Sequence, residues 1–508
     1  MASAVSRPIA NLERYFLGLG NARMFYNVAI GTRLRFQPSN GPKELPRDKD
    51  QWLALLVPAL ATVLQRHPLM NTYIADHLAS TPTFQAMSSI DLSKIVAVDS
   101  IQQPEDIAKL LQVEHDKPFD LANHAVPLWR IMVVQVVGDG TFYLLYFYHH
   151  SLSDGRSSAV FTEQLIDALN HPNNTVPELV ASNNPWTITC PTAPLPLPME
   201  QRVEGTPSLK TLVRHFLNLF ILPARLKMAL ETPYWAGEFP STLTGPNKTQ
   251  IGVVVLTPEE TDQVIAAAKR EKTTVNSVLF TSLLFAIKSV FHSGRHNDND
   301  KEELPTTTKD LFKASTMVCP RQLFSPVVER SEHVLFIAEL VSQGHCVKLE
   351  TPFWDFTRAY HAQVIEVQTP EACRKLLEFY GTLDYMSKTP QGYERALHRR
   401  YVRQQHGREG TVRTSNIGVG WRGQEREDLA FKVLHPVFSQ SAVTTGPVFT
   451  FCIATGGGSL VVSNAWEREA FQSRERADRV LEEFRRIVVE ACQEGQERYL
   501  FRDVVVSA

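Results

Sequence analysis

The feature that most constrains the fold is a pair of apolar runs at 127–150, "PLWRIMVVQVVGDGTFYLLYFYHH", joined by Gly138-Asp139-Gly140. Both runs are rich in β-branched and aromatic residues, and the glycines tolerate the positive φ of a tight turn, so we predict a β-hairpin. The second strand is apolar at nearly every position, which indicates that both of its faces are covered. A chain with such a strand needs layers on either side of a sheet.

His149 and His150 end this second strand, and "SLSDG" forms a turn before a helical pattern, "RSSAVFTEQLIDALN". Successive strand residues point to opposite faces, so the two histidines cannot both enter one cleft. Asp154 is placed to accept backbone N–H bonds at the helix start, and Gly155 to supply the conformational freedom of the turn. A neutral imidazole held in this position suits a general base, although a histidine with a structural role gives the same spacing.

The chain is long enough for more than one domain. A prior of about 100–200 residues per domain suggests two or three for 508 residues, and we predict two. A stretch rich in Pro and Asn at 170–198 interrupts the regular patterns. We therefore place an N-terminal subdomain at 1–190, a connector with an amphipathic helix at 191–248, and a C-terminal subdomain at 249–508.

Composition and motif spacing exclude several functions. The chain has 52 Lys and Arg against 54 Asp and Glu, which leaves no positive excess to bind nucleic-acid phosphates. Six scattered cysteines without C-x-x-C spacing indicate neither a zinc site nor a disulfide framework. The sequence contains no G-x-S-x-G, Walker or H-E-x-x-H motif. Its start lacks a signal-peptide pattern and no 18-residue apolar run occurs, so we expect a cytoplasmic protein, or one peripheral to an intracellular membrane.

Two helical patterns raise particular questions. The pattern "DQWLALLVPALATVLQRHP" is expected to break at Pro58. The segment 208–230, "SLKTLVRHFLNLFILPARLKMAL", is apolar in its centre and basic at its edges. Packing on the protein's own core is favoured for such a helix, and contact with a membrane surface is the alternative.

Several segments together resemble the chloramphenicol acetyltransferase-like superfamily, which includes condensation domains and plant and fungal acyltransferases. His150-x-x-x-Asp154-Gly155 resembles its signature, "QRHPLM" the end of an early helix, and "STMVCPRQLF" a strand that ends in an arginine, here Arg321. From "LERYFLGLGNARMFYNVAIGTRL" to "GSLVVSNAWE", nearly the whole chain is similar to fungal alcohol acetyltransferases. The D-F-G-W-G segment of the plant branch is absent, and "HPVFSQSA" stands roughly in its place.

This resemblance implies an α/β fold with mixed sheets, in which two chloramphenicol acetyltransferase-like domains enclose an active-site tunnel at their interface. It also implies acetyl transfer from acetyl-CoA to the hydroxyl of an alcohol or hydroxylated natural product. His150 would be the general base, without a covalent acyl-enzyme. Acetyl-CoA is a co-substrate in this scheme, and we expect no permanently bound cofactor or metal.

The resemblance also assigns roles around the base. Asp154 and Gly155 are expected to shape the turn, with Arg321 as an ion-pair partner of Asp154. The oxyanion would be stabilised by Ser439, by Ser441 or by a backbone N–H, and the sequence does not choose among them.

Two other interpretations stay open. The same fold and base would serve an amine acceptor or a carrier-protein donor, and a chain that binds a metabolite without turnover would share the pattern. The partners expected are acetyl-CoA and a small-molecule alcohol, with no nucleic acid, and we expect a monomer. Two histidines serve as controls: His67, before Pro68, is expected to cap a helix end, and His149 to face away from the cleft.

Overall fold

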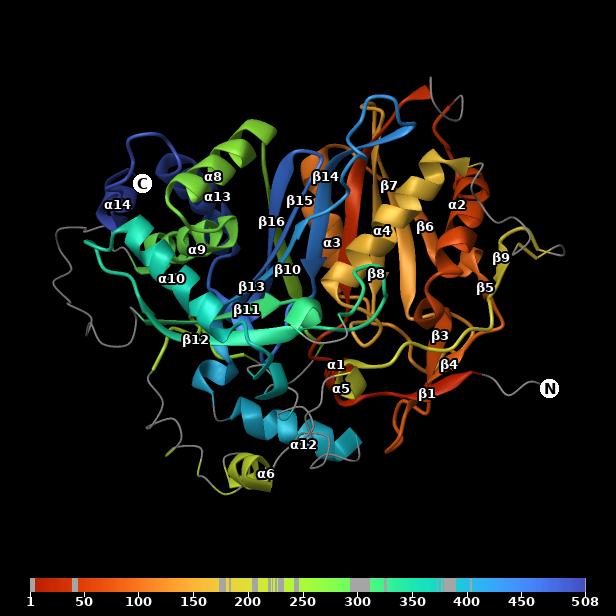
Figure 1. Ribbon diagram of the computed structural model, residues 1–508, viewed down its shortest axis with the longest axis horizontal. Coiled ribbons are helices and arrows are strands. Elements are labelled where there is room, and N and C mark those ends of the chain that lie inside the picture. The colour runs from red at the N-terminus through yellow and green to blue at the C-terminus, as the bar shows by residue number, and fades with distance from the viewer. Residues whose placement is uncertain are drawn as a thin grey trace.

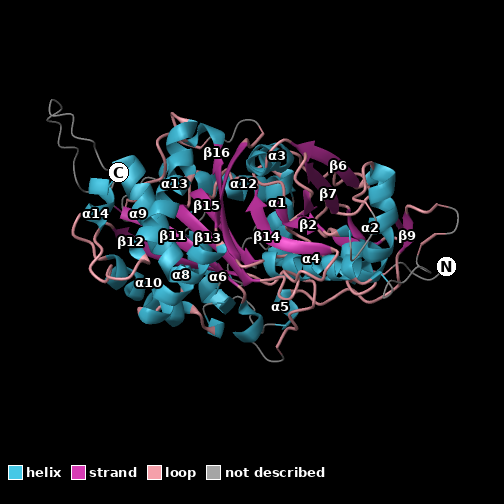
Figure 2. Cartoon of the chain, turned by 90° about the horizontal axis from the view of Figure 1, so that it is seen from above, coloured by secondary structure: helices cyan, strands magenta, loops and turns pink. Residues whose placement is uncertain are grey.

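Two large β-sheets lie next to one another in the computed structural model (Figure 1). The structure describes 5–38, 44–172, 180–181, 184–202, 209–217, 233–241, 246–292, 311–323, 327–371, 373–375, 390–402 and 404–507, with residues 221, 223, 226 and 378. The connector predicted at 191–248 therefore lies partly outside the described residues. Seen from above, strand β14 (Phe431–Gln440) lies between the helices that flank one sheet and those that flank the other (Figure 2).

The first sheet has the predicted hairpin at its centre. β7 (Trp129–Val136) pairs antiparallel with β8 (Thr141–Tyr148), and Gly138 and Gly140 between them have positive φ. All eight residues of β8 are buried, so the prediction that both of its faces are covered is confirmed. The strand order is β14 (Phe431–Gln440), β2 (Val28–Phe36), β8, β7 and β6 (Val96–Ile101).

Helices on this sheet follow from caps and apolar spacing. α4 (Gly155–Asn170) begins where the Asp154 side chain accepts a hydrogen bond from the Ser157 N–H, as predicted. α4 packs against α2 (Lys49–Leu64) and contacts β2. α3 (Ile107–His115) contacts β2 and also β10 (Thr249–Leu256) of the second sheet.

The expected break at Pro58 is wrong, because α2 continues through this residue to Leu64. A proline inside a helix removes one hydrogen bond and costs about 3 kcal/mol. Nearly every residue from Leu56 to Leu64 is buried, and this packing offsets the local cost. Burial therefore overrides the proline signal here.

The second sheet is built from the C-terminal half. Its order is β10 (Thr249–Leu256), β16 (Ser459–Glu467), β15 (Pro447–Gly456), β13 (Gly410–Val419), β11 (Leu311–Val318) and β12 (Ala338–Cys346). The helices α8 (Pro258–Arg270), α9 (Val275–His292), α10 (Phe353–Val367) and α13 (Arg474–Ala491) cover it and complete a second hydrophobic core. α14 (Phe501–Ser507) closes the far end of this core.

One strand joins the two halves. β14 comes from the C-terminal half, yet it pairs antiparallel with β2, with Gln440 opposite Val28 and Ser439 opposite Ala29. β14 also contacts β15 and β16 of the second sheet. β14 therefore belongs by sequence to the predicted C-terminal subdomain, 249–508, but by pairing to the sheet of the predicted N-terminal subdomain, 1–190.

Shorter elements surround the junction. α1 (Asn11–Asn21) lies near α5 (Met199–Arg202) and contacts α12 (Pro390–Tyr401), while β1 (Ser6–Pro8), β4 (Thr83–Ala86) and β3 (Thr72–Ala75) form a small sheet. β5 (Ser89–Asp91) pairs with β9 (Thr187–Thr189). α6 (Leu209–Phe216) lies beyond α12 at the lower edge of Figure 1.

Within the described ranges, no single helix has the length and hydropathy to cross a bilayer. α8 together with the first 17 residues of α9, bent by 106°, passes the same criteria on composition alone.

Candidate active site

His150 lies in the turn between β8 and α4, where both flanking elements are firmly anchored. Its Nδ1 is 2.9 Å from the carbonyl oxygen of Ser153. A carbonyl oxygen can only accept, so in the neutral ring Nδ1 carries the hydrogen and Nε2 keeps the lone pair. The turn thus selects the tautomer in which Nε2 is the basic nitrogen.

Aromatic side chains surround this imidazole. The ring of Phe16 stacks on it at a centroid distance of 3.9 Å and an angle of 14°, and Phe25 and Tyr148 lie within about 6 Å. Burial lowers the pKa of His150 to about 4, while the charge of Asp154 acts in the opposite direction. The imidazole is therefore neutral at physiological pH, the form that a general base requires.

Asp154 holds the turn by contacts on both carboxylate oxygens. Oδ1 accepts from the N–H of Ser157 at 2.8 Å, and Oδ2 accepts from the N–H of Phe336 at 2.7 Å. Arg321 completes the set, because its Nη2 donates to Oδ2 at 2.8 Å and both side chains are almost fully buried. The predicted Asp154–Arg321 ion pair is present. Through Arg321 and Phe336, Asp154 ties the start of α4 to both ends of the segment between β11 and β12.

Gly155 has a different role from the one expected. Its φ is not in the positive region, so the turn does not require the conformational freedom of glycine here. A Cβ at this position would lie 2.7 Å from Cγ2 of Ile417 and 3.1 Å from Cζ of Phe438. Lack of space, and not backbone conformation, is what makes a glycine necessary.

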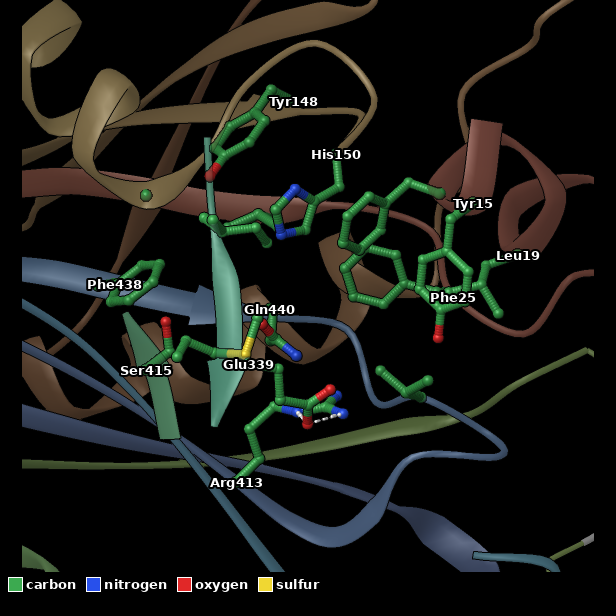
Figure 3. A pocket seen from close by; sticks show the side chains of 16 residues that line it. Tyr15, Leu19, Phe25, Tyr148, His150, Glu339, Arg413, Ser415, Phe438 and Gln440 are labelled. Carbon is green, nitrogen blue, oxygen red and sulfur yellow. Dashed lines mark hydrogen bonds and ion pairs between the residues drawn. The ribbon is translucent and has the colours of Figure 1, made fainter. Parts of the chain in front are cut away.

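His150 borders a cavity of about 60 Å³ at the junction of the two halves (Figure 3). One wall is aromatic and comes from α1, from the segment after it and from β14, and the other is the face of the second sheet at β11, β12 and β13. Residues of both halves therefore meet at the imidazole. The side chains that line the cavity include Tyr15, Phe16, Phe25, Phe438, Gln440 and Arg413.

A half-buried ionic cluster forms part of the second wall. Arg413 of β13 contacts Glu339 of β12 at 2.7 Å and also contacts Glu409. Arg413 and Glu339 both line the cavity. Sequence reasoning missed this cluster, because alternation along a strand reveals an inward-facing charged residue only once the strand's register is known.

The two serines proposed as oxyanion donors do not line the cavity. The Ser439 hydroxyl lies 2.7 Å from Nε2 of His115, and the Ser441 hydroxyl accepts from the N–H groups of Tyr26 and Asn27. Their side chains tie β14 to the N-terminal half. Gln440 lies between them in sequence and points to the opposite face, into the cavity.

The control histidines lie outside this cavity. His149 is buried, and its Nδ1 accepts from the Ser151 N–H at 3.2 Å. We expected the His67 side chain to cap the end of α2. Its Nε2 instead lies 2.7 Å from Oε1 of Gln164 in α4. The ring of His67 therefore joins two helices.

A second cavity, of about 480 Å³, lies on the other side of the β11 strand end. Met317 lines both cavities, and Gly155 of the first is followed in sequence by Arg156 of the second. The second cavity is lined partly by polar residues near the starts of α4 and α9, namely Arg156, Thr274, Asn276 and Asn416. Neither cavity holds a metal site, since no three His, Cys, Asp or Glu residues cluster for one in the described part of the chain.

Comparison with known sequences finds a family model that matches most of the chain and individual proteins that match parts of it. The model of the alcohol acetyltransferase family matches residues 11–488. The probable alcohol acetyltransferase FCK4 of Fusarium pseudograminearum is 26% identical over 231 residues, which cover 44% of this chain and 46% of that protein. The probable alcohol acetyltransferase crmB of Aspergillus fumigatus is 22% identical over 167 residues, 31% of this chain and 35% of that one. The aligned parts span less than half the length of these relatives.

Solved structures share the fold over nearly the full chain. The trichothecene 15-O-acetyltransferase TRI3 of Fusarium sporotrichioides has a TM-score of 0.67 at 11% identity, covering 96% of this chain and 95% of that one. The condensation domain of the Monacolin K polyketide synthase MokA has a TM-score of 0.53 at 12% identity, covering 98% and 100%. These likenesses show the fold alone, and they confirm the predicted chloramphenicol acetyltransferase-like class.

Proposed function

The chain belongs to the alcohol acetyltransferase family and is an acyltransferase, and from this premise we propose that it transfers acetyl from acetyl-CoA to the hydroxyl of an alcohol. His150 is the general base. The observation that carries this assignment is the Nδ1 contact to Ser153, which leaves a neutral Nε2 as the basic nitrogen beside a cavity.

The reaction needs one base and no covalent intermediate on the protein. The alcohol oxygen attacks the thioester carbonyl carbon while Nε2 of His150 takes the hydroxyl proton. The tetrahedral intermediate then collapses, the carbon–sulfur bond breaks, and the thiolate of CoA takes the proton from the imidazolium. The aromatic wall around His150 excludes water, which would otherwise compete as the nucleophile.

The two cavities offer separate approaches for the two substrates. We place acetyl-CoA in the larger one, where the guanidinium of Arg156 and other polar side chains suit a phosphate-bearing donor. The alcohol occupies the aromatic cavity beside His150. Met317, which lines both, marks the point where the acetyl carbon and the hydroxyl would meet.

The oxyanion requires a hydrogen-bond donor in the same cavity, and Gln440 is our candidate. Gln440→Leu is expected to lower kcat by about 10²- to 10³-fold, the usual cost of removing one oxyanion donor. Ser439→Ala is the matched control on the opposite face of β14, and it should lower stability by about 1 kcal/mol, since it removes one buried hydrogen bond, while kcat changes little. A similar loss of kcat in both variants would contradict the assignment.

The pH dependence of the rate tests the base itself. Because burial lowers the pKa of His150 to about 4, the imidazole stays unprotonated down to about pH 5. We expect initial rates that stay level as the pH falls to about 5 and drop as it passes about 4. A drop centred near 6.5, the ordinary value for histidine, would contradict this environment for the base.

Folding must be followed in the same experiment. Burial also lowers the pKa values of His115 and His149 to about 3, so both are neutral in the folded protein. The unfolded chain takes up protons at these histidines below about pH 6.5, and stability is therefore lost as the pH falls below that value. Circular dichroism at each pH separates unfolding from protonation of the base.

The reaction class is tested by mass spectrometry. Purified protein, acetyl-CoA and a panel of small and terpenoid-sized alcohols are expected to give acetyl esters, and His150→Ala should form them about 10²- to 10⁴-fold more slowly. Amines and carrier-protein thioesters are included in the same panel. Products from those substrates alone, or tight binding without turnover, would overturn the proposed acetyl transfer to an alcohol.

A further inference from the structure

α6 and the residues after it expose a concentration of large apolar side chains. Leu209 is 77% exposed, and Val213 and Leu217, four and eight residues on, are 49% and 47% exposed. Residues at this spacing lie along one side of a helix. Two more follow in sequence, Ile221 at 60% and Leu226 at 48%. Single exposed apolar residues are ordinary on a protein surface, but a row of them along one side of a helix, here Leu209, Val213 and Leu217, marks an interaction site.

All charged residues of the segment 208–230 are basic. Lys210 and Arg214 are exposed on α6, one residue after Leu209 and Val213. The stretch 208–230 contains four Lys and Arg residues and no Asp or Glu, in a chain whose net charge is only −2. An apolar row flanked by cations is the pattern that binds an anionic lipid surface.

The position of α6 leaves this row accessible. Figure 1 shows α6 at the lower edge of the molecule, beyond α12 and away from both sheets. It contributes no residue to either cavity described above. Contact with a partner at this edge would therefore leave His150 and its surroundings in place.

We propose that α6 docks the protein on an anionic lipid bilayer. Leu209, Val213 and Leu217 enter the boundary between headgroups and acyl chains, while Lys210 and Arg214 contact the lipid phosphates and carboxylates. A second copy of this chain is the less suitable occupant, because a symmetric contact would place the same cations against one another. This contact is independent of the acetyl transfer proposed above.

The test is vesicle flotation with the purified full chain. Phosphatidylcholine vesicles with phosphatidylserine should bind the protein, and vesicles of phosphatidylcholine alone should bind it at least about tenfold less. Val213→Glu with Leu217→Glu removes part of the apolar row, and Lys210→Glu with Arg214→Glu reverses the flanking charge. Each pair should reduce the bound-to-free ratio on anionic vesicles by about tenfold or more.

Matched substitutions elsewhere on the surface provide the control. Leu78→Glu with Leu349→Glu makes the same change at two apolar residues that are 58% and 56% exposed, and Lys94→Glu with Lys109→Glu matches the charge reversal. These variants should bind anionic vesicles like the wild type. Absence of binding by the wild type, or equal loss in the controls, would overturn the proposal.

Oligomeric state is measured on the same samples by light scattering. A monomer whose vesicle binding depends on α6 supports the lipid surface as the partner. A dimer that Val213→Glu with Leu217→Glu converts to a monomer would instead assign this row to contact between copies, and would overturn the lipid proposal.

Discussion

Replacing His150 with alanine is expected to lower kcat/KM by about 10²- to 10⁴-fold, the range that a positioned general base contributes. The imidazole is the basic group whose orientation the turn dictates, through the 2.9 Å contact between its Nδ1 and the Ser153 carbonyl. Its side chain is partly exposed to the cavity, so its removal should leave the hydrophobic core intact. The loss is measured from initial rates of ester formation, with circular dichroism to establish folding.

His149→Ala is the matched control, because the two histidines are neighbours that face different environments. His149 is buried and contacts Ser151, and its Nε2 lies 2.9 Å from where a Cβ on Gly20 would be. Its removal should create a small cavity and lower stability, while the folded fraction keeps most of its turnover. A greater loss of turnover in His149→Ala than in His150→Ala would reverse the assignment of the base.

Asp154→Asn is expected to destabilise the fold by about 3–5 kcal/mol, because it leaves the buried guanidinium of Arg321 without its counter-charge. Arg321 also contacts the Cys319 sulfur, the Ser157 hydroxyl and the Val334 carbonyl, but none of these is a carboxylate that could replace Asp154. The measurement is the free energy of unfolding in urea. Turnover per folded molecule should fall far less than it does in His150→Ala.

Two further variants serve as controls for the stability loss of Asp154→Asn. Asp355→Asn removes an exposed carboxylate that pairs with Arg358, and it should change stability by less than about 1 kcal/mol. Asp154→Asn with Arg321→Met removes the stranded charge and should recover part of the lost stability. If Asp154→Asn kept its stability but lost its turnover, the carboxylate would belong to the chemistry and not to the turn.

The local features of the site could be read from the sequence, because neighbours along the chain determine them. A hairpin joined by Gly-Asp-Gly, a strand apolar at nearly every position and a carboxylate at the N-cap of a helix each depend on a few consecutive residues. The structure contains all three. The Asp154–Arg321 pair, expected from the family resemblance, is present as well.

The tertiary structure determines which side chains face His150 across the cavity. β14 crosses to the sheet of the other half, and its register places Gln440 in the cavity and turns Ser439 and Ser441 toward His115 and the Tyr26–Asn27 backbone. A shift of one residue in pairing would exchange these faces, and nothing within β14 itself specifies which pairing is adopted.

Packing between segments that are distant in sequence explains the glycine at position 155 and the helix that continues through Pro58. Gly155 is needed because Ile417 and Phe438, more than 260 residues away in sequence, approach it closely, and α2 passes through Pro58 because both sides of that residue are buried. The sequence by itself determined the turn that holds His150 and the cap of the following helix, because the Ser153 contact of His150 and the Ser157 contact of Asp154 are local. Only the tertiary structure decided what faces that histidine, because contacts between distant segments depend on pairing and packing that no short stretch encodes.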